Sequence, residues 1–274
     1  MVHQTEQFEK TSVWVEIRLH NRNFHRRNVG GVFEIRFCGK VVNPLDCVAG
    51  HFNGLSKVLV FGTSDSSLLL KYYIEKDPLY HDFEVVGFTV TKDFLDQEEI
   101  DGLPVIDFAD AEMSFPPSEY LLFAPLTGTK MNKFRAEIFH QGKAKGYSFF
   151  SYVSSWATIL TEEIGENCFI LEDNTVQPFV KIGNNVVLWS GNHIGHHSTI
   201  HDHVYFTSHV VLSGHCDVGA YSWFGVNATV RDQISIGEST LVAMGALISK
   251  DTDSSGFYLG VPAKKQAQSS HEVM

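Results

Sequence analysis

Hydrophobic side chains recur at every sixth position through the second half of this chain. Fifteen successive sixth residues are aliphatic or aromatic, without a gap or an insertion: Ile164, Ile170, Val176, Ile182, Leu188, Ile194, Ile200, Phe206, Leu212, Val218, Phe224, Val230, Ile236, Val242 and Ile248. A helix repeats every 3.6 residues and a strand every 2, so neither element produces this period. A fixed short period is typical of a solenoid, in which each turn of chain stacks on the previous one.

Three hexads of flat strand make one triangular coil of 18 residues. The position four after each hydrophobic residue is small or β-branched, except at Asn174 and Asn192, which suits the narrow part of a prism. Glycines mark an 18-residue spacing, with His201 in one missing place: Gly165, Gly183, Gly219 and Gly237. We expect these glycines to adopt corner dihedrals that other residues resist. Five coils at about 4.8 Å spacing give a prism about 24 Å long, whose flat faces predict an oligomer.

Residues 55–157 instead alternate between strand and helix patterns. The strand patterns cover residues 57–61, 83–90, 104–106, 120–124 and 147–153, and the helical ones cover 68–75 and 130–145. This order predicts a small Rossmann-like α/β domain with a parallel sheet. The two flanking segments are a 1–54 extension, either a small β appendage or a disordered segment, and a 253–274 tail. Between the α/β domain and the tail, residues 158–252 form the all-β parallel β-helix.

Parallel sheets bind ligands at the carboxyl ends of their strands, here in residues 62–65 and 125–129. The candidate substrate-binding residues in these loops are Gly62, Thr63, Ser64 and Thr127. A helix cap is the alternative role for Ser64 and Asp65. The first loop lacks the GxGxxG pattern, and Asp65 would repel a pyrophosphate, so a redox dinucleotide is not expected.

Composition excludes several classes of partner. The net charge is −11 with 21 basic residues, which argues against nucleic acid or an anionic membrane. The four cysteines, Cys38, Cys47, Cys168 and Cys216, form no CxxC pair. Cys168 and Cys216 occupy inward positions of the coil, so we expect them to be reduced core residues. Reduced cysteines and the lack of an apolar signal core or membrane-length run predict a cytoplasmic protein.

Seven histidines lie between positions 193 and 215, and outward, solvated positions of the solenoid are the simplest explanation for most of them. Transfer of an acyl group from a thioester needs a proton acceptor, for which neutral imidazole is suited, and a donor for the oxyanion. Gly214 follows His196 by 18 residues and so stacks directly against it on the next coil. A glycine allows a ligand to approach its N–H, which makes His196 and Gly214 the candidate catalytic pair.

Residues 164–264 resemble the left-handed β-helix sugar acyltransferases of the hexapeptide-repeat superfamily. Within it the chain is most similar to the NeuD-like sialic acid O-acetyltransferase and bacillosamine N-acetyltransferase group, whose members carry an α/β domain ahead of the prism. The matching stretches are Trp189 to His197, Gly225 to Val230, Gly245-Ala246 and Gly260 to Lys264. The resemblance implies a left-handed helix, a homotrimer with sites between prisms, acetyl-CoA as donor and a nucleotide-sugar acceptor.

The resemblance also implies roles for single residues. The family's catalytic histidine corresponds to His196, and the glycine amide at the thioester carbonyl corresponds to Gly214. A second histidine near the thioester falls on Tyr205, and His197 replaces the acidic neighbour of the base. Asp202, Asp217 or a residue of the next subunit are then candidates for orienting the imidazole. Lys264 and Lys265 are candidates for binding CoA phosphates, with a solvated tail as the alternative.

These observations lead to an acetyl-CoA-dependent transferase that acetylates an amino or hydroxyl group of a sugar for surface polysaccharide synthesis. The alternative is a metal-dependent lyase or hydratase of the gamma-carbonic-anhydrase type on the same prism. That family would require histidines at a first position, 36 later and 41 later, and this chain has no such triple, so no metal ligand is assigned. A non-enzymatic binding or scaffold solenoid is the third hypothesis. The ice-binding kind needs a repeated Thr-x-Thr face, which is absent from the sequence.

Overall fold

The computed structural model describes residues 14–19, 22–29, 32–37 and 55–274, in two compact units, 1–47 and 48–274. In the first unit, β1 (Trp14–Leu19), β2 (Arg22–Val29) and β3 (Val32–Phe37) form an antiparallel sheet in that order. Val29 pairs with Val32, so β2 and β3 form a hairpin. Gly30 and Gly31, which lie between these two strands in the sequence, and the cysteines Cys38 and Cys47 lie outside the described residues.

The second unit begins with a five-stranded sheet of order β6-β7-β5-β4-β8. All of its neighbouring strands are parallel except β6 and β7. Its strands are β4 (Ser56–Phe61), β5 (Phe83–Val90), β6 (Glu99–Ile100), β7 (Leu103–Asp107) and β8 (Leu121–Phe123). The helices are α1 (Asp65–Lys76), α2 (Ala111–Ser114) and α3 (Lys133–Ala144), with 3-10 turns η2 (Pro78–Tyr80), η3 (Lys92–Phe94) and η4 (Phe108–Asp110). The apolar run in β4 is buried because neighbouring strands and helices cover it, as the sequence predicts for a parallel sheet.

The expected last strand of this domain, residues 147–153, is divided between two sheets. Phe149 forms a single bridge to Leu122 beside β8, whereas β9 (Tyr152–Val153) pairs with the solenoid strand β12. The prediction of one continuous α/β strand was therefore wrong. An apolar run is buried equally well in either sheet, so hydrophobicity does not reveal where the chain passes from one to the other.

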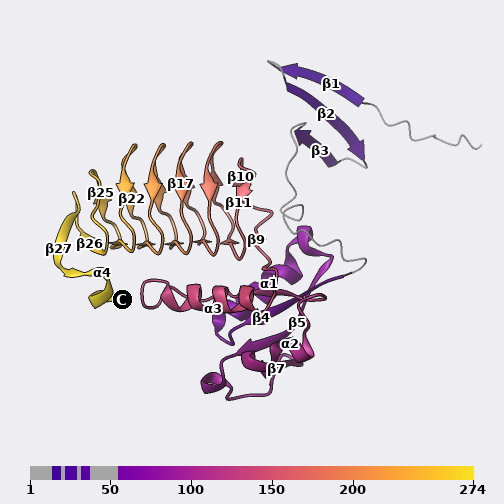
Figure 1. Cartoon of the computed structure of the whole chain (residues 1–274). Coiled ribbons are helices and arrows are strands. Elements are labelled where there is room, and N and C mark those ends of the chain that lie inside the picture. Colours follow the sequence, from indigo (N-terminus) through magenta and orange to yellow (C-terminus); the bar gives the residue numbers. More distant parts are fainter. Residues whose placement is uncertain (1–13, 20–21, 30–31, 38–54) are drawn as a thin grey trace, which may run out of the picture. The chain divides into compact units, whose positions relative to one another are not determined.

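The hexads form a triangular prism with three parallel faces, as predicted (Figure 1). The first face contains β9, β12 (Phe169–Ile170), β15 (Val187–Leu188), β18 (Tyr205–Phe206), β21 (Trp223–Phe224), β24 (Leu241–Val242) and β26 (Gly256–Leu259). The second contains β10 (Thr158–Ile159), β13 (Thr175–Val176), β16 (His193–Ile194), β19 (Val211–Leu212), β22 (Thr229–Val230) and β25 (Leu247–Ile248). The third contains β11 (Glu163–Ile164), β14 (Lys181–Ile182), β17 (Thr199–Ile200), β20 (Asp217–Val218) and β23 (Ser235–Ile236).

From β11 to β22 each strand pairs with the strand 18 residues later, for example Ile182 with Ile200. The hydrophobic residue of each hexad points inward into one continuous core, in which Phe206 and Phe224 stack with ring centroids 4.4 Å apart. Cys168 and Cys216 are buried in this core as expected, and burial raises the pKa of the Cys168 thiol to about 12. A thiol in that state is not a redox or nucleophilic group at neutral pH.

The four regularly spaced glycines do not have the predicted corner dihedrals. The left-handed conformation belongs instead to the residue two positions later, such as Asn167 and Asn185. Glycine is needed because neighbouring coils approach closely: a Cβ on Gly165 would lie 2.6 Å from the carbonyl carbon of Gly183. The expected reason for these glycines was wrong, although their spacing does mark one edge of the prism.

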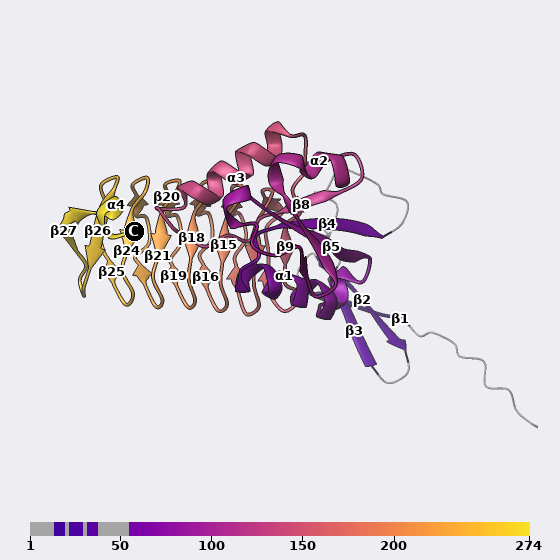
Figure 2. The same ribbon diagram turned by 90° about the horizontal axis from the view of Figure 1, so that it is seen from below.

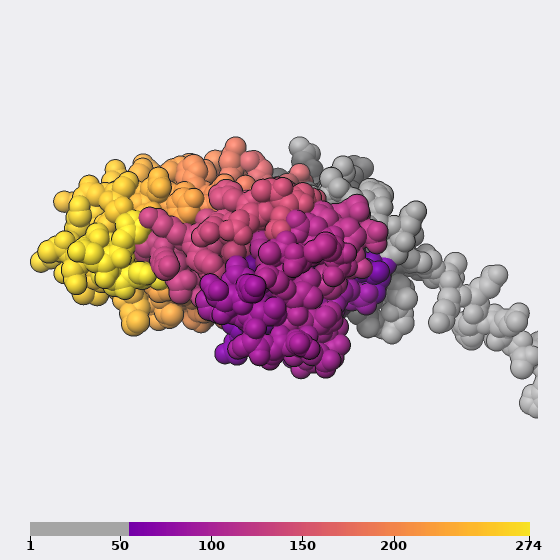
Figure 3. Space-filling view, turned by 60° about the horizontal axis from the view of Figure 1, so that its bottom comes forward, coloured from indigo at the N-terminus to yellow at the C-terminus, as the bar shows by residue number. Residues whose placement is uncertain are grey.

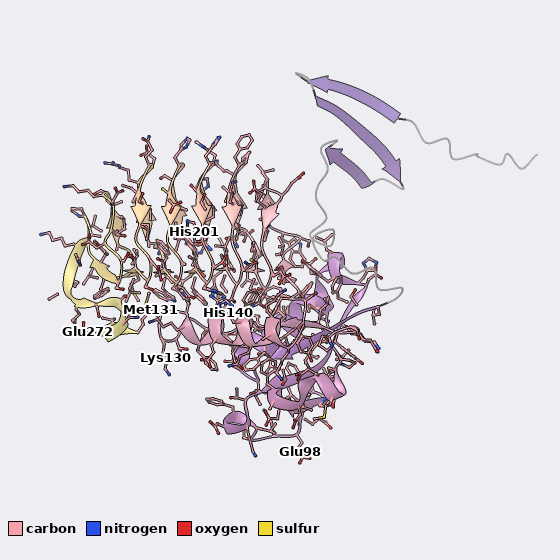
Figure 4. All side chains as sticks on the ribbon, in the orientation of Figure 1. Glu98, Lys130, Met131, His140, His201 and Glu272 are labelled. Atoms are coloured by element: carbon pink, nitrogen blue, oxygen red, sulfur yellow. The ribbon has the colours of Figure 1, made fainter. Side chains whose placement is uncertain are left out.

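The α/β domain and α3 cover the first face of the prism, as the views from below show (Figures 2 and 3). Arg135 of α3 donates to the Asn185 carbonyl over 2.7 Å, and Asn132 donates to the Tyr221 carbonyl over 3.1 Å. His140 of α3 also faces the coils (Figure 4), with its ring centroid 5.3 Å from that of His203. The outward side chains of this face are therefore mostly buried.

The other two faces differ in chemistry. The outward residues of the third face are Glu163, Lys181, Thr199, Asp217 and Ser235, of which all but Thr199 are exposed. Those of the second face are Thr158, Thr175, His193, Val211, Thr229 and Leu247, with no acidic residue, lysine or arginine. Charged side chains keep the third face in water, whereas the second face is suited to packing against protein.

The segment expected as a tail is ordered on the end of the prism. β26 pairs in parallel with β24, and β27 (Lys264–Ser269) pairs antiparallel with β26. Helix α4 (Ser270–Val273) follows a capping box formed by Ser269 and Glu272. Among the described residues, no helix combines the length and apolar character needed to cross a membrane.

Candidate functional site

His196 lies at the edge between the second and third faces, directly after β16. Its backbone N–H donates to the side-chain oxygen of Gln177 on the preceding coil over 2.9 Å, which fixes the corner. The imidazole is exposed on the surface of the prism. The side chain is thus neither packed in the core nor covered by the chain's own α/β domain.

Gly214 lies under this imidazole on the next coil, as the 18-residue spacing predicts. A Cβ on Gly214 would lie 2.9 Å from His196 Cε1 and 3.1 Å from Nε2. Among residues 55–274, no protein group accepts a hydrogen bond from the Gly214 N–H. The structure therefore brings together an imidazole and an available backbone donor on neighbouring coils.

His197 contacts the His196 ring through its Nδ1 atom. The two Nδ1 atoms lie 3.0 Å apart, so one of them carries the shared proton. If His196 Nδ1 donates it, His196 Nε2 keeps a free lone pair and can act as a base. The aspartates considered from the sequence lie elsewhere: Asp202 accepts from the Asn184 N–H over 2.7 Å, and Asp217 pairs with His201 over 3.2 Å.

His215 and Phe179 complete a row of rings along this edge. The rings of His197 and His215 stack with centroids 4.8 Å apart, and Phe179 packs on the other side of His197 at 4.6 Å. One nitrogen from each of His196, His197 and His215 lies within 4.8 Å of the other two. Sequence spacing alone could have identified this cluster, because residues 18 apart always stack in such a prism.

Tyr205, the candidate acyl-carrier contact, is not at this edge. It is an outward residue of the first face, only 6% exposed, between Trp189, which donates to its hydroxyl, and the guanidinium of Arg135. Burial raises the pKa of its phenol. The correspondence between Tyr205 and a histidine of the similar family did not reveal that α3 covers this face. Because α3 covers it, Tyr205 is a packing residue in this chain.

Lys264 and Lys265 lie on β27 and are both exposed. Lys265 pairs with Asp253 over 2.7 Å, which raises its pKa. The two lysines therefore differ, and Lys264 is the one without an ion pair among residues 55–274.

The loops after β4 and β8 lie side by side, since a Cβ on Gly62 would be 3.5 Å from Leu126. Gly62 has a φ of 109°, which glycine adopts readily. Ser64 begins α1 without a side-chain capping bond, and Thr127 is exposed, so both hydroxyls are available. The helix-cap alternative for Ser64 and Asp65 has no support in the hydrogen bonds.

These loops and His196 belong to different sides of the chain. The α/β domain covers the first face, whereas His196 lies on the opposite edge, where the other two faces meet. The two parts of the predicted site are therefore not joined within one copy.

Comparison with known proteins finds a family model that matches part of the solenoid. The model of the bacterial transferase hexapeptide family (six repeats) matches residues 163–195 and 179–214. A curated relative, the acyl-[acyl-carrier-protein]–UDP-N-acetylglucosamine O-acyltransferase of Campylobacter concisus, is 28% identical over 95 residues, which are 32% of this chain and 36% of the relative. The chain thus spans about a third of the length of this relative.

Two solved structures resemble most of the described second unit. A mutant of perosamine N-acetyltransferase from Caulobacter crescentus, in complex with CoA and GDP-perosamine, is 18% identical with a TM-score of 0.69, covering 78% of this chain and 99% of that one. The acetyltransferase domain of PglB from Neisseria gonorrhoeae is 21% identical with a TM-score of 0.67, covering 77% and 99%. The chain has the same fold, an α/β domain followed by a left-handed β-helix of hexapeptide repeats.

Proposed function

We propose that this protein is an acetyl-CoA-dependent acetyltransferase that modifies an amino or hydroxyl group of a nucleotide-linked sugar, in the synthesis of a surface polysaccharide. The observation that carries the proposal is the position of the His196 imidazole directly over Gly214, whose N–H has no protein acceptor within residues 55–274. A base and an oxyanion donor side by side at an exposed edge are what acyl transfer from a thioester requires.

The reaction follows from this geometry. The sugar nitrogen or oxygen attacks the thioester carbonyl carbon while His196 Nε2 takes its proton. The Gly214 N–H donates to the oxyanion of the tetrahedral intermediate. When the intermediate collapses, the carbon–sulfur bond breaks and the imidazolium returns the proton to the CoA thiolate. His197 holds the imidazole through the Nδ1 contact and so serves as a positioning residue.

The acceptor and donor classes are supported by the proteins of the same fold. One of them is described in complex with CoA and GDP-perosamine, and another with acetyl coenzyme A. The hydroxyl-rich loops at Gly62, Thr63, Ser64 and Thr127 lie where parallel sheets bind ligands, and they are the candidate contacts for the nucleotide sugar. Lys264 is the remaining candidate contact for a CoA phosphate.

The arrangement of the faces supports a homotrimer. The second face is uncharged, and Phe179 is 68% exposed at the edge that carries His196. Packing of second faces between copies would remove this apolar surface from water. It would also place each His196 at a seam between prisms, where the α/β domain of a neighbouring copy can supply the sugar-binding loops that the same copy cannot.

The test has two steps. Isothermal titration of the full chain with acetyl-CoA should show binding, and a thermal-shift panel of UDP-, dTDP-, GDP- and CMP-linked amino sugars should show which acceptor raises the melting temperature by mass action. Release of CoA thiol, followed colorimetrically, should then depend on both ligands. Lack of acetyl-CoA binding by the folded protein would leave the proposal without support and favour a binding or scaffold solenoid.

A further inference from the structure

Three imidazoles of one chain meet at a single point on the edge of the prism. His196 and His197 face each other through Nδ1 atoms 3.0 Å apart, and one nitrogen of His215 lies within 4.8 Å of both. All three side chains are exposed, so an ion from solution can reach them without a change of fold. Residues separated by one and by 18 positions converge here only because the coil returns to the same edge.

The chemistry of these donors selects a class of ion. Three imidazole nitrogens without a carboxylate or thiolate in the group suit Zn²⁺, Cu²⁺, Ni²⁺ or Co²⁺, and not Mg²⁺ or Ca²⁺, which prefer oxygen. Zinc binds imidazole nitrogen at about 2.0–2.1 Å, so tetrahedral ligand atoms are separated by roughly 3.3 Å. The 3.0 Å contact between the two Nδ1 atoms is close to that value, and a small ring rotation would open it.

We propose that His196, His197 and His215 form a binding site for a Zn²⁺-class ion that inhibits the protein. The ion takes the place of the proton shared by the two Nδ1 atoms, and that proton passes through solvent to His196 Nε2. With its Nδ1 bound to metal, neutral His196 carries its remaining proton on Nε2 and has no lone pair to accept one from the substrate. The inhibitory half of this inference rests on the proposed acyl transfer, whereas the metal site does not.

This role differs from catalysis by a metal. All three ligands belong to one edge of one chain, and the same imidazole is the proposed base. Metal and substrate proton therefore compete for His196, and the ion lowers turnover in proportion to its occupancy. The site offers the cell, or an experimenter, a means to switch the enzyme with free zinc.

The chain offers a matched control for the test. His215 has a φ of 58° and His209 a φ of 60°, and both are exposed corner residues on the same coils. His209 lies on a different edge and outside the cluster. Asparagine tolerates this left-handed conformation, so His215→Asn and His209→Asn should have the same small effect on the backbone. Only His215→Asn removes a proposed metal ligand.

Binding is measured with ZnCl₂ by equilibrium dialysis, and with CoCl₂ by visible absorption, on the full chain after removal of any histidine tag. We expect one Zn²⁺ per wild-type chain, a tetrahedral Co²⁺ spectrum, and binding at least about tenfold weaker in His215→Asn, since a lost ligand costs no less than a lost supporting contact. His209→Asn should bind like the wild type. Equal zinc binding by His215→Asn and the wild type would overturn the site.

Turnover distinguishes this inference from the proposed function. Zn²⁺ should inhibit thiol release by the wild type, and His215→Asn should need at least about tenfold more zinc for the same inhibition. Zinc binding without any acetyl transfer would sustain the site and remove the proposed function. Acetyl transfer that is indifferent to bound zinc, or that chelators abolish, would overturn the inhibitory role, and the second result would favour a metal-dependent enzyme.

Discussion

The position of a single ring decides what the edge of this prism can do. The imidazole of His196 occupies the space where any other residue at 214 would carry a Cβ. Its Nδ1 is held by His197, so Nε2 is the nitrogen that can accept a proton from a substrate. The three residues lie on two successive coils and depend on the 18-residue repeat for their alignment. Changes at this scale should therefore affect turnover more than stability.

Replacement of His196 by alanine should lower kcat by roughly 10²-fold or more, because the proposed general base is lost. The fold should be unaffected, since the side chain is exposed. Steady-state thiol release with an O-linked acceptor provides the measurement, and His201→Ala, which changes an exposed histidine on another edge, is the control. A variant with wild-type turnover would exclude His196 from proton transfer.

Gly214→Ala should lower kcat while changing the free energy of unfolding by less than about 1 kcal/mol, because the site is at the surface. The new Cβ would lie 2.9–3.2 Å from three atoms of the His196 ring, so the imidazole must move off its position. Urea unfolding and kinetics on the same sample separate the two effects. A large loss of stability with kcat unchanged would mean that the glycine serves packing alone.

At the scale of elements, a row of polar side chains joins α3 to the edge where the third and first faces of the prism meet. Asn185 accepts from Asn167 over 2.8 Å and from Arg135 over 3.0 Å, so its amide nitrogen must be the donor to His203 Nδ1 at 2.9 Å. Arg135 is fully buried, and its Nε and Nη1 have no hydrogen-bond partner among residues 55–274. Burial lowers the pKa of this guanidinium to about 10. The interface between α3 and the prism therefore depends on buried polar groups, and leaving such a group unpaired lowers the stability of the fold.

This row predicts a specific acid sensitivity. Burial, and then the charge of Arg135, lower the pKa of His203 from 6.5 to about 4. Between about pH 6.5 and 4 the unfolded chain binds a proton that the folded chain does not, so stability falls as the pH falls through this window, by up to about 3 kcal/mol.

Urea unfolding at pH 7 and pH 4.5 tests this expectation. His203→Asn keeps a residue that tolerates the left-handed φ of 65° but does not titrate, so it should lose less stability than the wild type between the two pH values. His209→Asn, at an exposed corner, should lose as much as the wild type. Identical losses in all three proteins would show that His203 is not the group responsible.

The whole molecule assigns each face of the prism a different environment. The α/β domain covers the first face, charged side chains keep the third in water, and the second remains uncharged next to the edge that carries His196. Apolar groups there include Val211, which is 39% exposed, and Phe179. Such a surface is expected to be buried between copies of the chain.

Val211→Glu should convert the proposed trimer into monomers, because an acidic group would have to be buried in the seam. Analytical ultracentrifugation measures the state, and Ser235→Glu, at the equivalent outward position of the third face, is the matched control. The monomer should also lose acetyl transfer, since its own α/β domain does not reach His196. A wild-type sedimentation coefficient for Val211→Glu would place the interface elsewhere.

The sequence by itself determined the prism and the pairing of its coils. Every sixth side chain must enter the core, and a period of three hexads puts residue 196 over residue 214 whatever surrounds them. Most of the strands and helices between residues 55 and 146 follow in the same way from local hydrophobic patterns. These features are repetitive or local, so the amino-acid sequence alone is enough to predict them.

Only the tertiary structure decided what covers each face. The burial of Tyr205 under α3 depends on contacts across more than 60 positions of sequence, and no short-range pattern contains them. The same holds for the passage of residues 147–153 from one sheet to the other. Long-range packing sets these outcomes because many apolar surfaces of similar character compete for the same partners.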